Sequence, residues 1–231
     1  MGDIHGCAHA LDAILEAIEP QPTDLFISLG DFIDMGRDTA AVMDRLIEIE
    51  QQCEFVALLG NHEEMLPEAL TNERLRESWF QHGGIDTINS YRYGGRVEDI
   101  PPDHIDFVRR CRPYYETDHH LYVHANFDPN LPLAEQPDHL LRWTLLENEP
   151  HEPHVSGKTA IVGHTEQRNG EILDLGCVMG IDTYCHGYGW LTAIDVLSGQ
   201  VWQASRWGVL RDGDDVQGMK SLAPQLKTER V

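Results

Sequence analysis

At 231 residues the chain is long enough for one domain with a sizeable hydrophobic core. Its formal charge of −22 at pH 7 disfavours nucleic acid and anionic membranes as partners, because so acidic a surface repels both. The five cysteines are scattered without a C-x-x-C pair, and no signal peptide or long apolar run is present, so we expect reduced thiols and a cytoplasmic location.

The N-terminal part of the chain alternates between two kinds of hydrophobic pattern. Apolar residues at helical spacing predict helices over residues 8–19 and 39–52. Short apolar runs over residues 24–29 and 54–59, each followed by a glycine, predict buried strands. Helices that alternate with such strands are typical of a parallel α/β arrangement.

The rest of the chain drifts from helices to strands. The patterns predict helices over 63–70, 73–80, 103–111 and 139–146, a hairpin from 114–117 and 120–123, and strands over 159–162, 171–174, 178–182, 191–196 and 201–204. The apolar pattern fades after Gly208. We therefore expect one α/β domain over residues 1–207 and a polar, poorly ordered tail over residues 208–231.

Three short blocks each begin with glycine and then place side chains that bind metals: Gly2-Asp3-Ile4-His5-Gly6, Gly30-Asp31-Phe32-Ile33-Asp34 and Gly60-Asn61-His62-Glu63. The second and third blocks directly follow predicted strands. Ligands of an open α/β sheet gather at the carboxyl ends of its strands, so we expect the blocks to meet in space. Their carboxylate, imidazole and amide groups suit Mn, Fe, Zn or Mg rather than soft copper.

These blocks resemble those of the calcineurin-like metallophosphoesterases, in particular the phosphoprotein-phosphatase type with its GDxHG, GDxxDRG and GNHE motifs. The resemblance extends to His124-Ala125 and Gly163-His164-Thr165 and covers nearly the whole chain, to Ser205. It implies a metallophosphoesterase-type four-layer αββα sandwich of two mixed β-sheets. It also implies two divalent metal ions as cofactors, with Mn favoured and Fe, Zn or Mg as alternatives.

The resemblance assigns a role to each site residue. One ion would be bound by Asp3, His5 and Asp31, and the other by Asp31, Asn61, His124 and His164. Two such ions lie ~3.5–4 Å apart and need a shared ligand, here Asp31, and a bridging hydroxide that attacks phosphorus in line. His62, oriented by Asp34, would be the general acid that protonates the leaving oxygen.

Two positions depart from the family pattern. Met35 stands where the family has an Arg, and we expect Arg37 to contact the phosphate instead. Leu145 occupies the expected place of the second phosphate-binding Arg, which Arg142 can replace only if the helix turns differently. A complete ligand set beside altered phosphate contacts predicts an active metal site whose substrate differs from that of the typical member. His186, in a glycine-rich turn, is not expected to be a ligand.

We therefore predict a metal-dependent phosphatase for phosphomonoesters, either phosphoserine or phosphothreonine in a protein or a small phosphoester. Hydrolysis of dinucleoside polyphosphates is an alternative, because bacterial diadenosine tetraphosphatases share these blocks. A metal-binding pseudophosphatase is another: Met35 supports it, and the Asp34–His62 pair opposes it. An acidic surface repels a phosphorylated substrate, so bound metal ions and nearby arginines must reverse the field at the site.

Met1 stands directly before the first block, where the resembled family has a buried strand. We expect that the start codon is misassigned and that this N-terminal strand is missing from the sequence. A central strand buries several apolar side chains, so its loss would be costly.

Overall fold

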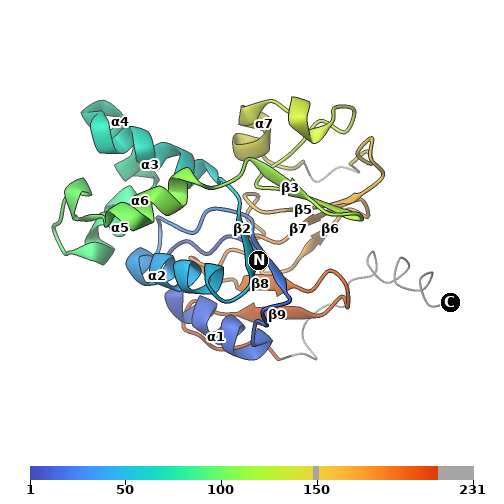
Figure 1. Ribbon diagram of the computed structural model, residues 1–231, viewed down its shortest axis with the longest axis horizontal. Helices are drawn as coiled ribbons and strands as arrows, with labels where there is room; N and C mark the ends of the chain where they lie inside the picture. Colours follow the sequence, from blue (N-terminus) through green and yellow to red (C-terminus); the bar gives the residue numbers. More distant parts are fainter. Residues whose placement is uncertain (148–150, 213–231) are drawn as a thin grey trace.

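The computed structural model describes residues 1–147 and 151–212 (Figure 1). Its N-terminal part has the predicted alternation of helices and strands: α1 (Ala8–Ile18), β1 (Leu25–Ser28), α2 (Thr39–Glu50) and β2 (Glu54–Ala57). Strands β1 and β2 pair in parallel, as the pattern predicted. A helical region follows, with α3 (Asn61–Thr71), α4 (Glu73–Trp79), the π-helical turn η1 (Phe80–Gly84), α5 (Ile85–Tyr91), η2 (Val97–Asp99) and α6 (Pro102–Arg109).

The second half contains a five-stranded mixed sheet, in the order β3-β4-β5-β7-β6. It is built from β3 (Tyr114–Glu116), β4 (His120–Val123), β5 (Thr159–Val162), β6 (Leu173–Asp174) and β7 (Val178–Gly180). The turn η3 (Leu133–Glu135) and helix α7 (Asp138–Trp143) lie between β4 and β5 in the chain. The last pair, β8 (Leu191–Ile194) and β9 (Val201–Ala204), is antiparallel.

Three separate hydrophobic clusters lie between four layers. One packs α1 and α2 against β1, β8 and β9, a second lies between those strands and the five-stranded sheet, and a third covers the far face of that sheet beneath α7. The alternation along β4 shows this directly, because Tyr122 points into the middle cluster while Leu121 and Val123 point into the outer one. The layers are those of the αββα sandwich that the sequence predicted.

The sequence did not predict α5, which follows the Gly83-Gly84 break closely. Gly83 has a φ of +96°, and Gly84 lies against the ring of Trp79 where a Cβ would be 2.3 Å from the indole. The two glycines thus redirect the helix instead of ending the helical region. Helix α7 is shorter than predicted and stops at Trp143.

Residues 208–212, the first part of the predicted tail, lie beside β9. Leu210 bridges to Ala204, and the Arg211 amide donates to the carbonyl of Gln203 over 2.8 Å. The remainder of the predicted tail lies outside the described residues. No helix in the described ranges is both long and apolar enough to cross a bilayer.

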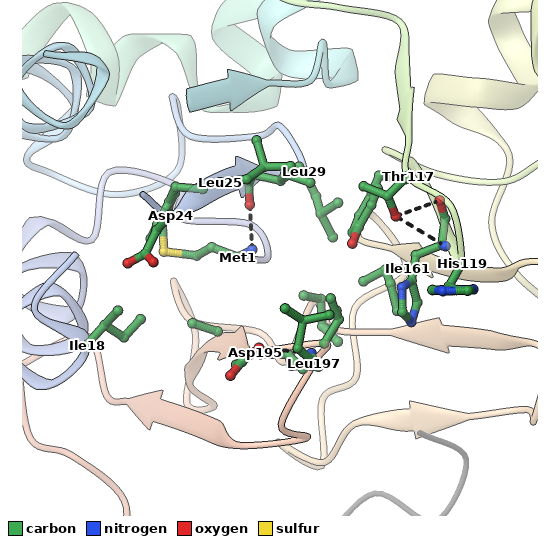
Figure 2. Close-up of a pocket in the computed structure, with 18 of the residues that line it drawn as sticks. Met1, Ile18, Asp24, Leu25, Leu29, Thr117, His119, Ile161, Asp195 and Leu197 are labelled. Carbon is green, nitrogen blue, oxygen red and sulfur yellow. Dashed lines mark hydrogen bonds between the residues drawn. The ribbon is translucent and has the colours of Figure 1, made fainter. Parts of the chain in front are cut away.

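A groove of about 640 Å³ separates β1 from β8, and Met1 lies at its end. Figure 2 shows Met1 between the segment that carries Leu25 and Leu29 and the turn that carries Asp195 and Leu197. The first residues link the two strands as a strand would: the Leu29 amide donates to Met1 O over 2.9 Å, and the Gly2 amide donates to the carbonyl of Thr192, also over 2.9 Å. Met1 itself lines the groove, so a segment added before Met1 would begin at the apolar lining of this space.

We expect a chain extended before Met1 by a strand-forming segment to have a higher melting temperature than the 231-residue chain. Each apolar side chain that enters the groove would contribute ~1.5–3 kcal/mol. The extension also replaces the N-terminal amine, which donates to the carbonyl of Ile27 over 2.7 Å. Equal melting temperatures, measured by circular dichroism, would refute the missing strand.

The pH dependence gives a second check of the buried amine. Burial lowers the pKa of the Met1 amine from 8.0 to about 5, so between these values the unfolded chain binds a proton that the folded chain excludes. The stability of the unextended chain should therefore fall as the pH falls through this window. The difference in melting temperature between the two chains should widen towards about pH 5.

Candidate metal centre

Three predicted ligands lie just after strands: Asp31 after β1, His124 after β4 and His164 after β5. Asn61 begins α3, and Asp3 and His5 lie before α1. His5, Asp31 and His164 all have left-handed backbone angles, with φ of 44°, 48° and 61°. Such angles are costly for residues other than glycine, and they cluster at functional sites where the surrounding structure holds them. Here they turn the side chains away from the strand direction and into one buried space.

Two glycines allow the carboxylates to approach the backbone. A Cβ on Gly60 would lie 2.1 Å from Oδ1 of Asp31, and one on Gly163 would lie 2.1 Å from Oδ1 of Asp3. Any larger residue would displace these carboxylates. The glycines that open the blocks therefore have a steric purpose that the motif alone did not explain.

Backbone carbonyls set the orientation of the histidines. Nδ1 of His5 lies 3.0 Å from the carbonyl oxygen of Ile33, and Nδ1 of His124 lies 2.8 Å from that of Leu29. A carbonyl only accepts, so each Nδ1 carries a proton, and Nε2 is the ring nitrogen left to bind a metal. This arrangement is typical of histidines that bind metals through Nε2.

The Nε2 atoms of these histidines lie close to the carboxylate of Asp31. Its Oδ2 lies 3.7 Å from Nε2 of His5 and 3.4 Å from Nε2 of His124. Two sets of side chains, each with its ligand atoms within 4.8 Å of one another, share this carboxylate: His5, Asp31 and His62, and Asp31, His124 and His164. Oδ1 of Asn61 lies 3.1 Å from Nε2 of His124. The structure thus brings four predicted ligands, His5, Asn61, His124 and His164, together around Asp31, and it places His62, the predicted acid, among them.

Asp3, the remaining predicted ligand, is in neither set of converging ligand atoms among the described residues. Its Oδ2 accepts a hydrogen bond of 2.9 Å from the amide of His164. Its Oδ1 is buried without a hydrogen-bond partner. An unsatisfied buried carboxylate oxygen is costly and is consistent with a missing cation.

The electrostatics of the site also fit divalent cations. Burial raises the pKa of Asp3 well above its usual value, and the nearby carboxylates of Asp182 and Asp31 raise it further. Burial and Asp31 likewise raise the pKa of Glu63 to about 8. Burial lowers the pKa of His5 to about 3, which keeps the imidazole neutral and able to bind a metal. Oxygen and nitrogen donors with excess buried negative charge suit hard or borderline divalent ions.

His62 and Asp34 form the predicted pair beside this cluster. Nδ1 of His62 lies 2.8 Å from Oδ2 of Asp34. The same carboxylate accepts hydrogen bonds from Nε1 of Trp79 at 2.7 Å and from the hydroxyl of Thr87 at 2.6 Å. Burial raises the pKa of Asp34, but three donors around its oxygens favour the ionised form, which we assign. Burial alone would lower the pKa of His62, but Asp31 and Asp34 outweigh it and raise that pKa to about 9.

Sequence reasoning gave Glu63 no role, although it belongs to the third block. Its carboxylate accepts hydrogen bonds from the amides of Asp31, Phe32 and Ile33 at 2.7, 3.0 and 3.2 Å. It also accepts one from Gly60 at the start of α3, where it occupies the third helical position. Glu63 therefore holds the turn that carries Asp31. The only sequence signal for this was a Glu at the N3 position of a helix.

His186 lies closer to the cluster than the sequence indicated. Its ring centroid is 4.8 Å from that of His5, on which it stands edge-on. Its Nε2 lies 3.5 Å from Oε1 of Glu166. The residue is not part of either set of converging ligand atoms among the described residues.

The arginines predicted to contact phosphate are placed differently from each other. Arg37 is exposed, and its charge acts on Asp86. Arg142 is buried, and its guanidinium is held by Glu64 and Asp138. Met35 is 42% exposed and Leu145 is 59% exposed.

Comparison with known proteins places this geometry in context. Residues 1–188 match the model of the calcineurin-like phosphoesterase family. Serine/threonine-protein phosphatase 2 of Salmonella typhimurium is 36% identical over 85 residues, which cover 36% of this chain and 37% of that protein. The symmetrical bis(5'-nucleosyl)-tetraphosphatase of Stutzerimonas stutzeri is 27% identical over 141 residues, which cover 58% of this chain and 46% of that protein. The chain thus spans less than half the length of these relatives.

Solved structures agree on the fold. A crystal structure described as a diadenosine tetraphosphatase aligns with a TM-score of 0.66 at 20% identity, covering 88% of this chain and 90% of that one. A cold-active protein-tyrosine phosphatase of a Shewanella species aligns with a TM-score of 0.57 at 15% identity, covering 91% and 78%. At such identities the likeness concerns the fold. The match over residues 1–188 shows that the chain belongs to the calcineurin-like phosphoesterase family.

Proposed function

We propose that the protein hydrolyses phosphomonoesters with the help of two divalent metal ions. The observation that supports this most is the convergence of His5, His124 and His164 on Asp31, with the His62–Asp34 pair beside them. The ligand assignment is the predicted one: Asp3, His5 and Asp31 for one ion, and Asp31, Asn61, His124 and His164 for the other. Mn is the proposed metal.

The metal ions, when bound, would supply positive charge for the phosphoryl oxygens and lower the pKa of a water to make a nucleophile near neutral pH. The protonation of the leaving group is carried out by residues of the chain. His62, whose protonated form is favoured by the Asp34 carboxylate on Nδ1, donates its proton to the leaving oxygen. Asp34 holds the imidazole through Nδ1, so Nε2 faces the cluster, 3.9 Å from Oδ2 of Asp31. An imidazole held through Nδ1, with Nε2 facing the cluster, has the orientation that a general acid needs.

Phosphoserine or phosphothreonine in a protein is the proposed substrate. A proton donor such as His62 matters most for a poor leaving group, and the alkyl oxygen of serine or threonine is one. The partial match to a serine/threonine-protein phosphatase supports this reading.

Hydrolysis of a dinucleoside polyphosphate is a second candidate. The longer match, over 141 residues, is to a symmetrical bis(5'-nucleosyl)-tetraphosphatase. A panel of Mn-loaded assays with a phosphoserine peptide, p-nitrophenyl phosphate, bis-p-nitrophenyl phosphate and diadenosine tetraphosphate separates the two readings. Metal binding without turnover of any of these would favour the pseudophosphatase.

Asp31→Asn should remove both metal ions, because both ligand sets share this carboxylate. Metal content after dialysis, measured by mass spectrometry, should fall from two ions per chain to none. Asp12→Asn is the control, since Asp12 pairs with Arg45 on the surface. Two retained ions in Asp31→Asn would exclude the shared ligand.

His62→Asn should lower kcat for a phosphoserine peptide by ~10²–10⁴, the usual contribution of general acid catalysis. The loss should be much smaller for p-nitrophenyl phosphate, whose leaving group departs without a proton. His82→Asn, at an exposed histidine, should change neither rate. Equal losses for both substrates would argue against His62 as the acid.

Arg37→Ala should raise KM and lower kcat/KM by roughly 10- to 100-fold if Arg37 contacts the phosphate, as expected for a lost charged hydrogen bond. Arg74→Ala, at an exposed arginine on α4, is the matched control. Unchanged kinetics in Arg37→Ala would remove Arg37 from the site and leave the phosphate without this contact.

A further inference from the structure

Glu64 connects helix α3 to helix α7. Its Oε1 accepts a hydrogen bond from Nε of Arg142 at 2.8 Å and lies 2.7 Å from Nη2 of the same guanidinium. Its Oε2 accepts one from the indole Nε1 of Trp143. A single carboxylate on the first turn of α3 thus binds two consecutive side chains at the end of α7.

The arginine in this connection is almost entirely buried. Its side chain is 7% exposed, against 35% for that of Glu64. Asp138, one turn earlier on α7, accepts a further bond of 3.2 Å. All three guanidinium nitrogens thus lie within 3.2 Å of a carboxylate oxygen of Glu64 or Asp138, so Arg142 is already paired within the protein. Removal of Glu64 would leave a buried charge with one exposed partner, which strongly disfavours the present geometry.

The segment from Leu141 to Leu146 touches the loops that carry two predicted ligands. The amide of Ala125, directly after His124, donates to the carbonyl of Leu141 at 2.8 Å. The amide of Leu146 donates to the hydroxyl of Thr165 at 2.8 Å. The segment from Leu141 to Leu146 therefore contacts both the loop that carries His124 and the loop that carries His164.

Asn61, the third ligand on this side, begins the helix that carries Glu64. The Glu64–Arg142 pair thus fixes the distance between Asn61 on α3 and the segment that holds His124 and His164. The residues on the other side depend on different contacts. His5 is held by Ile33, and the Asp31 turn is held by Glu63.

We propose that the Glu64–Arg142 ion pair, with Trp143, positions the ligands of one metal ion, the one assigned to Asn61, His124 and His164. The proposal rests on the two-metal site of the proposed function. Glu64 and Arg142 touch neither metal nor substrate in this scheme and are positioning residues. Weakening the pair should loosen one ion and spare the ion held by Asp3 and His5.

The test compares the affinities of the two ions in Glu64→Gln and the unchanged protein by isothermal titration with Mn²⁺ and by metal analysis after dialysis. We expect one of the two affinities to fall by roughly 10- to 100-fold, as for other contacts that orient metal ligands, and the other to stay unchanged. Kinetics are not needed for this readout. Arg142→Gln should give the same pattern, and the double variant should lose no more than either single one.

Glu171→Gln is the matched control. Its pair with Arg211 has the same 2.7 Å separation and similar burial, 14% for Arg211 and 32% for Glu171, but it joins β9's continuation to the loop before β6. It should keep both affinities. Trp143→Phe keeps the ion pair and removes only the indole donor, so a loss of roughly 3- to 10-fold at the same ion is expected even if Glu64→Gln does not fold.

Three results would overturn the proposal: both affinities unchanged in Glu64→Gln and Trp143→Phe, both affinities reduced equally, or the same loss in Glu171→Gln. A different result would overturn the proposed function instead. If the unchanged protein binds fewer than two Mn²⁺ ions, the two-metal site fails before any variant is compared.

Discussion

A buried carboxylate, that of Asp31, is the interaction on which the site depends. His5, His62 and His124 all face its Oδ2 at 3.4 to 3.9 Å. The residue has a strained backbone angle, which the surrounding contacts must maintain. Gly60 leaves room for its Oδ1, and the Glu63 carboxylate holds its amide. Much of the local structure therefore serves to keep one charged group in one place.

Four consecutive residues in the first turn of α3 each contact a different part of the site. Successive helical residues point in directions about 100° apart, so neighbours in sequence reach different partners. Asn61 faces His124, His62 faces Asp34, Glu63 binds the turn of Asp31, and Glu64 binds Arg142. One helical turn thus connects both halves of the sandwich to the metal centre.

Both the whole chain and the site carry an excess of negative charge, which repels an anionic substrate. The chain carries a formal charge of −22, and the centre buries Asp3, Asp31 and Glu63 close together. Burial raises the pKa of Asp3, which is a measure of how unfavourable this arrangement is without a cation. Divalent ions would relieve it and would also reverse the local field towards an anionic substrate. The donor atoms and the buried negative charge of the site therefore suit divalent cations.

The sequence by itself determined the strand and helix alternation, the blocks and the candidate ligands. These follow from short-range patterns: hydrophobic periodicity, glycines at strand ends and side chains with metal-binding chemistry. It did not determine the role of Glu63, the pairing of Arg142 with Glu64 or the groove beside Met1. Those contacts join residues 26 to 78 positions apart, and only the packing of the four layers brings them together. A pattern within a few residues carries no information on contacts over such distances. The tertiary structure alone decided that Arg37 is exposed while Arg142 is paired, that Glu63 supports the turn of Asp31 and that a groove separates β1 from β8.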